Sequence, residues 1–204
     1  YLWNVFNHAG FGSAPKSGFP GEVGGRLRPF KTWRPIEQAT MSYGHGITVS
    51  LLQMARAYTV FANGGEILPV TMLKIDNVPA GKRVFSAKTT AAVNKMLEMA
   101  TQAGGTGTKA QVPGYRIAGK TGTTHKLEDG VYSPDKFVSS FVGFAPASDP
   151  RLIIAIMIDE PNGGEHYGGL VAAPVFSAVM SDSLRHMGIA QDAPLPEGPL
   201  IPKE

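Results

Sequence analysis

The longest uninterrupted apolar stretch of the chain, Leu152 to Ile158, restricts its fold more than any other feature. Its order, Leu-Ile-Ile-Ala-Ile-Met-Ile, lacks the alternation of apolar and polar residues that is typical of a strand with one wet face. It is too short to cross a bilayer. We therefore expect a strand that is buried on both faces, in the middle of a sheet covered by helices. The turn at Pro146–Pro150 separates it from another strand-like run, 137–145, which predicts an antiparallel hairpin.

Three other segments have the periodicity of helices. Apolar residues at helical spacing precede Asn63-Gly64-Gly65, and further helices are expected from Ser86 to Ala103 and from Val171 to Met187. A strand at 117–124 is expected to pair with the first strand of the hairpin. The predicted fold class is α/β of the α+β type, an antiparallel sheet flanked by helices.

Composition excludes several classes of function. The chain is 43% hydrophobic and 17% charged, which is ordinary for a globular protein. Its 19 lysines and arginines are scattered along the sequence, so nucleic acid is not an expected partner. The absence of cysteine removes disulfides, thiolate catalysis and cysteine-based zinc sites. The five histidines lack the spacing of metal ligands, and we expect neither a metal nor a cofactor.

The segment Ile117-Ala118-Gly119-Lys120-Thr121-Gly122-Thr123-Thr124 has the features of a binding edge. Gly122, among β-tolerant threonines, indicates a strand that another backbone approaches closely. Lys120 supplies a positive charge, and Thr121 and Thr123 supply hydroxyl and N–H groups for an extended, anionic, peptide-like ligand. Strand alternation places Lys120 and Gly122 on one face and the two threonines on the other. A single ligand therefore meets all four only along a free edge, and we expect this strand to have one.

A nucleotide-binding reading competes with this one. Gly114-x-x-x-x-Gly119-Lys120-Thr121 matches the P-loop pattern, in which a helix begins at the Lys-Thr pair and binds phosphate at its N-terminus. No helical periodicity follows Thr121 before Gly130, so a P-loop nucleotide-binding module is the less favoured alternative.

Lys120-Thr121-Gly122 is also one of three elements of the penicillin-binding and serine β-lactamase group, beside Ser-x-x-Lys and Ser-x-Asn. The surrounding motifs are Ser42-Tyr43-Gly44-His45-Gly46, Gly104-Gly105-Thr106-Gly107-Thr108, Gly143-Phe144-Ala145-Pro146-Ala147, Asp159-Glu160-Pro161 and Tyr167-Gly168-Gly169 followed by Ala173-Pro174-Val175-Phe176. In this order the chain resembles the C-terminal half of a class B penicillin-binding protein transpeptidase domain, closest to the division-specific penicillin-binding protein 3 (FtsI) type. The likeness covers residues 1–190, and residues 191–204 form a proline-rich C-terminal tail.

The resemblance implies a peptidoglycan D,D-transpeptidase that cross-links stem peptides through an acyl-serine intermediate in septal cell-wall synthesis and is inhibited covalently by β-lactams. Lys120 would stabilise charge and organise proton transfer. Thr121, Gly122 and Thr123 would bind the substrate or β-lactam carboxylate, and the Thr123 N–H would donate to the oxyanion. A D,D-carboxypeptidase or serine β-lactamase of the same fold is the other alternative.

Four ring-bearing residues gain interest from the resemblance. Tyr43 and His45 lie in a turn that contains two glycines. His125 follows the Lys-Thr-Gly segment, and Tyr167 directly precedes the Gly-Gly pair. In the family these segments border the substrate cleft. Judged from the residues alone, a structural histidine is the better interpretation of His45, and a solvated loop residue is an equally good interpretation of His125 and Tyr167.

The nucleophile is not recognisable in the chain. Ser13-Ala14-Pro15-Lys16 matches Ser-x-x-Lys formally, but Pro15 and the glycines that follow disfavour the helix that would bring Ser and Lys together. Ser-x-Asn does not occur. We expect both elements in an N-terminal part of the same domain that lies outside this chain, and we expect this chain alone to be inactive.

The resemblance also implies partners and a location. The expected partners are peptidoglycan stem peptides, β-lactam antibiotics, the N-terminal part of the domain and membrane proteins of the division complex. The expected location is the periplasmic face of the bacterial inner membrane, with an N-terminal anchor that lies outside this chain.

Overall fold

The computed structural model describes residues 1–194, which form two compact units that divide between Val93 and Asn94. Each unit is described by itself. The first contains helices α1 (Leu2–His8), η1 (Phe30–Thr32, a 3₁₀ turn), α2 (Pro35–Met41) and α3 (Leu51–Ala62), a small sheet of β1 (Glu66–Ile67) and β2 (Lys82–Arg83), and the beginning of α4 (Ala87–Met99).

Helix α3 anchors the irregular loop that precedes it. Its capping box is present, because the Gln53 N–H donates to Ser50 Oγ over 3.2 Å and the Ser50 N–H donates to Gln53 Oε1 over 2.9 Å. The buried Gln53 amide also donates to the carbonyls of Ser13 and Gly24. Lys16 has φ 62 and lies in this loop, outside any helix. The prediction that Ser13 and Lys16 are not one helical turn apart is confirmed.

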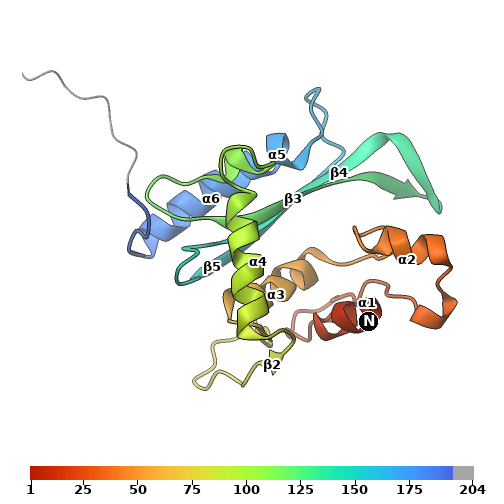
Figure 1. Ribbon diagram of the computed structural model, residues 1–204, viewed down its shortest axis with the longest axis horizontal. Helices are drawn as coiled ribbons and strands as arrows, with labels where there is room; N and C mark the ends of the chain where they lie inside the picture. The colour runs from red at the N-terminus through yellow and green to blue at the C-terminus, as the bar shows by residue number, and fades with distance from the viewer. Residues whose placement is uncertain (195–204) are drawn as a thin grey trace, which may run out of the picture. The chain divides into compact units, whose positions relative to one another are not determined.

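The second unit contains one larger sheet. Its elements are η2 (Thr108–Ala110), β3 (Ala118–Glu128), β4 (Val131–Ala145), β5 (Leu152–Asp159), α5 (Gly168–Val171) and α6 (Ala173–His186). The three strands are antiparallel in the order β3-β4-β5, and Figure 1 labels each of them. The Phe137–Ala145 and Leu152–Ile158 runs therefore form the predicted hairpin, and the predicted fold class is confirmed.

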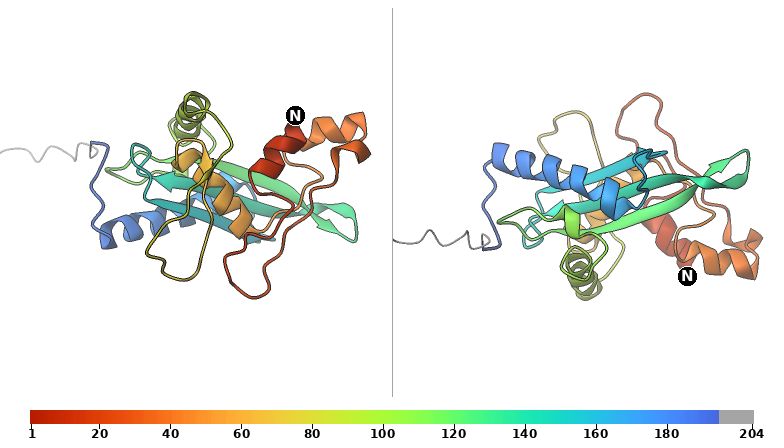
Figure 2. Two further views of the ribbon diagram at one scale, coloured as in Figure 1. Left: turned by 90° about the horizontal axis from the view of Figure 1, so that it is seen from below. Right: turned by 90° about the horizontal axis from the view of Figure 1, so that it is seen from above.

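Helix α6 packs lengthwise against β4 and β5 (Figure 2). Phe176 on α6 and Phe141 on β4 are fully buried, with ring centroids 4.6 Å apart, and Met180 and Leu184 extend the same apolar face of the helix. The sequence predicts a single helix from Val171 to Met187. The predicted helix corresponds to α6, which begins at Ala173 with Pro174 in its first turn, and the short helix α5 precedes it.

The predicted position of the apolar run is wrong. Strand β5 lies at an edge of the three-stranded sheet, and its residues are half-buried or exposed. The order follows from the connections, since two successive hairpins place the first and last strands at the edges. The side chains of Leu152, Ile154, Ile156 and Ile158 pack against the core, whereas Met157 on the other face is 54% exposed.

Two further predictions concern the C-terminal end of the domain and the tail that follows it. A domain portion that ends at residue 190 stays a prediction, and residues 195–204 of the proline-rich tail lie outside the described residues. The described helices include none with the length and apolar character needed to cross a membrane.

Candidate functional site

The Lys-Thr-Gly-Thr segment lies in the middle of β3. Lys120, Thr121, Gly122 and Thr123 face Val142, Phe141, Ser140 and Ser139 of β4 in the antiparallel register. Within residues 94–194 no strand pairs with the other side of β3, so the predicted free edge is confirmed. Thr121 is inside this strand, and no helix begins there. The P-loop interpretation is therefore wrong, because a phosphate site of that type needs a helix N-terminus.

The Lys120 ammonium bends across this edge. Its Nζ atom lies 3.1 Å from Thr121 Oγ1, 3.2 Å from Thr121 O and 3.4 Å from Thr106 Oγ1. Lys120 forms no salt bridge with any described residue of its unit. Strand alternation directs the Lys120 Cβ to the face opposite Thr121. The flexible side chain nevertheless bends back, so that its ammonium lies beside the Thr121 hydroxyl. Ammonium and hydroxyls thus converge on the free edge, where a carboxylate would find a cation and hydrogen-bond donors.

Thr106 is a member of this cluster that sequence analysis did not identify. Its hydroxyl lies 2.9 Å from Thr121 Oγ1. Neighbouring glycines set its position: Gly104 has φ 87, a Cβ on Gly105 would overlap Ala100 O, and a Cβ on Gly169 would overlap Thr106 O. The run of glycines around Thr106 was the available signal, but it does not reveal which strand the threonine faces.

The first residue of α5 binds Thr123. The Gly168 N–H donates to Thr123 Oγ1 over 2.9 Å. A Cβ on Gly168 would overlap the carbonyl oxygens of Gly122 and Ser140, so Gly168 approaches both strands closely because it lacks a Cβ itself. The predicted approach of a ligand backbone at Gly122 stays a prediction. The space where a Gly122 Cβ would lie is occupied by the Ser140 hydroxyl.

His125 and Tyr167 are brought together by two rings that were not predicted. The centroid of His125 lies 4.6 Å from that of Phe137, Phe137 lies 3.8 Å from His166, and His166 lies 4.5 Å from Tyr167. The result is a row of four rings from β3, β4 and the segment before α5. Tyr167 is 57% exposed at the end of the row. Whether His125 and Tyr167 contact substrate stays a prediction.

Tyr43 and His45 belong to the first unit and follow α2. Their rings meet edge to face at 5.4 Å, and Gly44 and Gly46 have φ values of 98 and 81. The predicted tight turn is present, because positive φ of this kind favours glycine. Tyr43 is 68% exposed. The predicted contribution of both residues to a substrate cleft stays a prediction.

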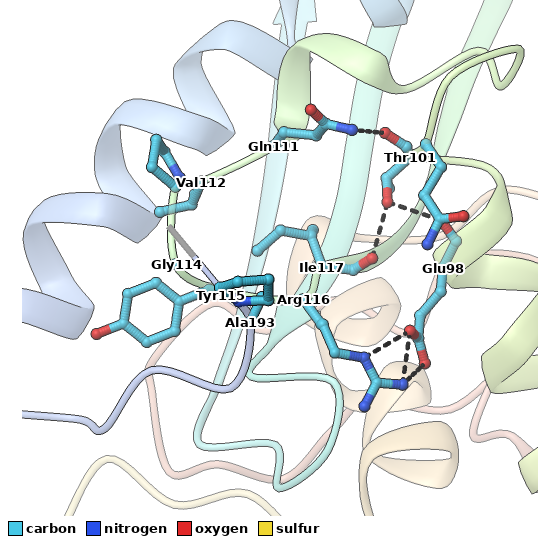
Figure 3. A pocket seen from close by; sticks show the side chains of 12 residues that line it. Glu98, Thr101, Gln111, Val112, Gly114, Tyr115, Arg116, Ile117 and Ala193 are labelled. Atoms are coloured by element: carbon cyan, nitrogen blue, oxygen red, sulfur yellow. Dashed lines mark hydrogen bonds and ion pairs between the residues drawn. The ribbon is translucent and has the colours of Figure 1, made fainter. Parts of the chain in front are cut away.

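A cavity of about 540 Å³ lies beside the segment that leads into β3 (Figure 3). Its wall includes Tyr115, Ile117 and the ion pair in which Arg116 Nη2 lies 2.8 Å from Glu98 Oε2. None of the residues Lys120 to Thr123 lines it. The described residues also contain no group of three or more His, Cys, Asp or Glu side chains placed to hold a metal ion.

Comparison with known proteins identifies the family of the chain. The model of the penicillin-binding protein transpeptidase domain matches residues 2–181. The chain is 48% identical over 194 residues to a protein from Neisseria flavescens named probable peptidoglycan D,D-transpeptidase PenA, and 40% identical over 193 residues to peptidoglycan D,D-transpeptidase FtsI of Escherichia coli K12. These alignments cover 95% and 94% of the chain, but only 48% and 33% of the two relatives, so the chain spans less than half the length of either.

A solved structure is also similar. The apo transpeptidase domain of penicillin-binding protein 3 from Burkholderia pseudomallei aligns with 94% of the chain at a TM-score of 0.88 and 50% identity, and 59% of that structure is covered. The similarity thus extends from the sequence to the backbone. The chain belongs to the family of penicillin-binding protein transpeptidase domains, as its sequence resemblance predicted.

Proposed function

We propose that the protein is a peptidoglycan D,D-transpeptidase and that this chain supplies the β3 edge on which the stem peptide binds. The observation that carries the proposal is the Lys120 ammonium, which has no carboxylate partner among the described residues of its unit and lies within 3.4 Å of two threonine hydroxyls. A free strand edge adds backbone groups that can pair with an extended peptide. Together they suit a peptide that ends in a carboxylate.

Each edge residue has a role in this proposal. Thr121 and Thr123 donate hydrogen bonds to the terminal carboxylate, and Lys120 neutralises charge and organises proton transfer. Gly122 meets the ligand through its backbone, since the space of a Cβ there is occupied by the Ser140 hydroxyl. The Thr123 N–H is one oxyanion donor. Removing one such donor typically slows catalysis by roughly 10²- to 10³-fold.

The reaction proceeds in two acyl transfers. A serine from a part of the protein outside this chain loses its proton to a base and attacks the penultimate D-alanyl carbonyl. The peptide C–N bond breaks, and the terminal D-alanine leaves with a proton on its amine. An amine from a neighbouring strand then attacks the acyl ester, forms the cross-link and returns the serine hydroxyl. A β-lactam acylates the serine in the same way, but its opened ring stays attached.

The cellular setting is part of the proposal. On the resemblance to the division-specific type, we propose a role in septal synthesis at the periplasmic face of the inner membrane, with membrane proteins of the division complex as partners. A D,D-carboxypeptidase or serine β-lactamase would use the same edge and transfer the acyl group to water. The names of the relatives favour an amine acceptor over water.

Labelling with a fluorescent penicillin tests the proposal. We expect no covalent label on the 204-residue chain by itself. The complete protein should be labelled on a serine outside these residues, and mass spectrometry of the labelled peptide identifies that serine. Label on a serine of this chain, or no label on the folded complete protein, would refute the proposed division of roles.

A further inference from the structure

We propose that Ser139 is a positioning residue that fixes the Thr123 hydroxyl as a hydrogen-bond donor to the ligand carboxylate. The inference rests on the proposed function of the β3 edge. Ser139 lies on β4 directly opposite Thr123 in the strand register and is fully buried, so it touches no ligand itself. Its effect on Thr123 must pass through the segment His166–Gly168.

The first step is the attachment of residue 166 to β4. The Ser139 hydroxyl donates a short hydrogen bond to the His166 carbonyl. The His166 ring is stacked on Phe137, with a centroid distance of 3.8 Å and an interplanar angle of 13°. Backbone and side chain of His166 are therefore both held by β4, and a buried serine is one of the two attachments.

The second step is the placement of Gly168. Two residues after His166, the Gly168 N–H lies 2.9 Å from Thr123 Oγ1. Gly168 reaches this position because it lacks a Cβ, which would overlap the carbonyl oxygens of Gly122 and Ser140. The segment is thus attached to β4 by one hydroxyl and to β3 by another. If the Ser139 attachment were lost, Gly168 would be free to move away from Thr123.

The third step is the polarity of Thr123. A hydroxyl has one proton to donate and two lone pairs to accept hydrogen bonds. Thr123 Oγ1 accepts from Gly168, and its own proton meets no acceptor in the described part of its unit, residues 94–194. With the inner side of the oxygen occupied by an N–H group, the proton is directed outward. A carboxylate on the free edge of β3 is a strong acceptor for it.

The test compares two probes on the complete protein: a penicillin with its free carboxylate and the methyl ester of the same penicillin. The ratio of their acylation rates measures recognition of the carboxylate. Thr123→Val, which removes the hydroxyl at nearly constant volume, should lower this ratio. Ser139→Ala should lower it by roughly three- to tenfold, the effect of one hydrogen bond, while acylation by the ester stays unchanged.

Double substitution separates positioning from general destabilisation. Ser139→Ala should have no further effect on the ratio in a Thr123→Val background, because the hydroxyl that it orients is already absent. The matched control is Ser177→Ala, which also removes a serine-to-carbonyl hydrogen bond, of 2.6 Å to Gln111, and should leave the ratio unchanged. Ser139→Cys keeps the volume with a weak donor and serves as the variant if Ser139→Ala does not fold.

The outcomes are distinguishable. Equal slowing of both probes by Ser139→Ala would mean that Ser139 is merely structural and would overturn the inference. An unchanged ratio in Ser139→Ala, together with a reduced ratio in Thr123→Val, would also overturn it while leaving the proposed function intact. An unchanged ratio in Thr123→Val itself would instead refute the carboxylate-binding role proposed for that residue.

Discussion

The sheet of the second unit has two free edges of opposite character. The edge at β3 presents an ammonium and threonine hydroxyls, whereas β5 at the other edge is a run of leucine, isoleucine, alanine and methionine. Both strands have β4 as their one strand neighbour among the described residues. Topology alone therefore does not distinguish them. The side chains do, since only β3 places a charge and hydroxyls where an incoming backbone would lie.

The two edges also contribute differently to stability. Leu152, Ile154, Ile156 and Ile158 of β5 pack against a core that includes Phe176, so substitutions there should destabilise the unit. Lys120 on β3 is exposed, and its loss removes little packing. We expect changes at β3 to affect ligand chemistry and changes at β5 to affect folding, and substitutions on each edge test this separation.

The largest effect is expected from Lys120→Ala. Acylation of the complete protein by penicillin should slow by roughly a hundredfold or more, because a charge that acts on the developing anion is lost. The unfolding temperature should stay close to that of the unmodified protein. Gel-based labelling over time and a thermal melt measure the two quantities.

Lys126→Ala is the matched control for Lys120→Ala. Lys126 lies on the same strand, beyond the Lys-Thr-Gly segment, but it forms salt bridges with Asp159 and Glu160. Its loss should leave acylation nearly normal. Comparable slowing by both substitutions, or near-normal acylation in Lys120→Ala, would remove the special role assigned to Lys120.

The next effect concerns β5. Ile156→Ala should reduce the free energy of unfolding by about 1–3 kcal/mol, which is less than the roughly 2–5 kcal/mol for a core isoleucine because Ile156 is only partly buried. Acylation by the folded variant should not change. Denaturant titration measures the loss.

Met157→Ala on the opposite face of β5 provides the comparison for Ile156→Ala. Met157 is 54% exposed, and its truncation should cost much less than that of Ile156. An equal loss for the two variants in the complete protein would mean that both faces of β5 are packed. That result would support the sequence-based expectation of a strand buried on both faces.

The contrast between the edges also explains which parts of the fold could be predicted from the sequence. Local rules predicted the turn at Gly44 and Gly46, because it depends on neighbouring residues alone. The position of β5 depends on how many strands the sheet contains and how they connect. An apolar run indicates that a strand is buried. The same run fits a strand that packs against one helix and a strand in the middle of a sheet.

The part of the site that is contiguous in the sequence could be predicted, and the part that comes from distant segments could not. Lys120, Thr121 and Thr123 are contiguous, so strand geometry fixes their relation. Thr106 and Ser139 reach the same site from a loop and from β4, and no local pattern links them to β3. The row of rings between His125 and Tyr167 likewise depends on Phe137, which lies twelve residues beyond His125 in the chain.

Thr106→Ala should have a smaller effect than Lys120→Ala. It removes a neutral hydroxyl that lies 2.9 Å from Thr121 Oγ1 and 3.4 Å from the Lys120 ammonium. Acylation by a penicillin that carries its carboxylate should slow by roughly three- to tenfold, the effect of one hydrogen bond. Thr108→Ala is the control, since this exposed threonine lies on η2 outside the cluster. Equal effects of the two substitutions would exclude Thr106 from the site.

The smallest effect is expected at the ion pairs that join the two edges. Lys126 on β3 lies 2.7 Å from both Asp159 Oδ2 at the end of β5 and Glu160 Oε1. Hydrogen bonds from Lys126 to these carboxylates raise the pKa of its ammonium above the usual value of 10.5. A raised pKa in the folded state contributes stability below the usual value, and this contribution disappears as the pH rises through the raised pKa.

Lys126→Gln should therefore lower the unfolding temperature slightly at neutral pH. The difference from the unmodified protein should shrink with added salt and disappear at strongly alkaline pH, because the pairs are exposed to solvent and screened by ions. Thermal melts of both proteins across pH and salt measure this difference. A difference that persists in high salt would mean that the Lys126 stem contributes by packing, and the two edges would then be joined by apolar contact instead of charge.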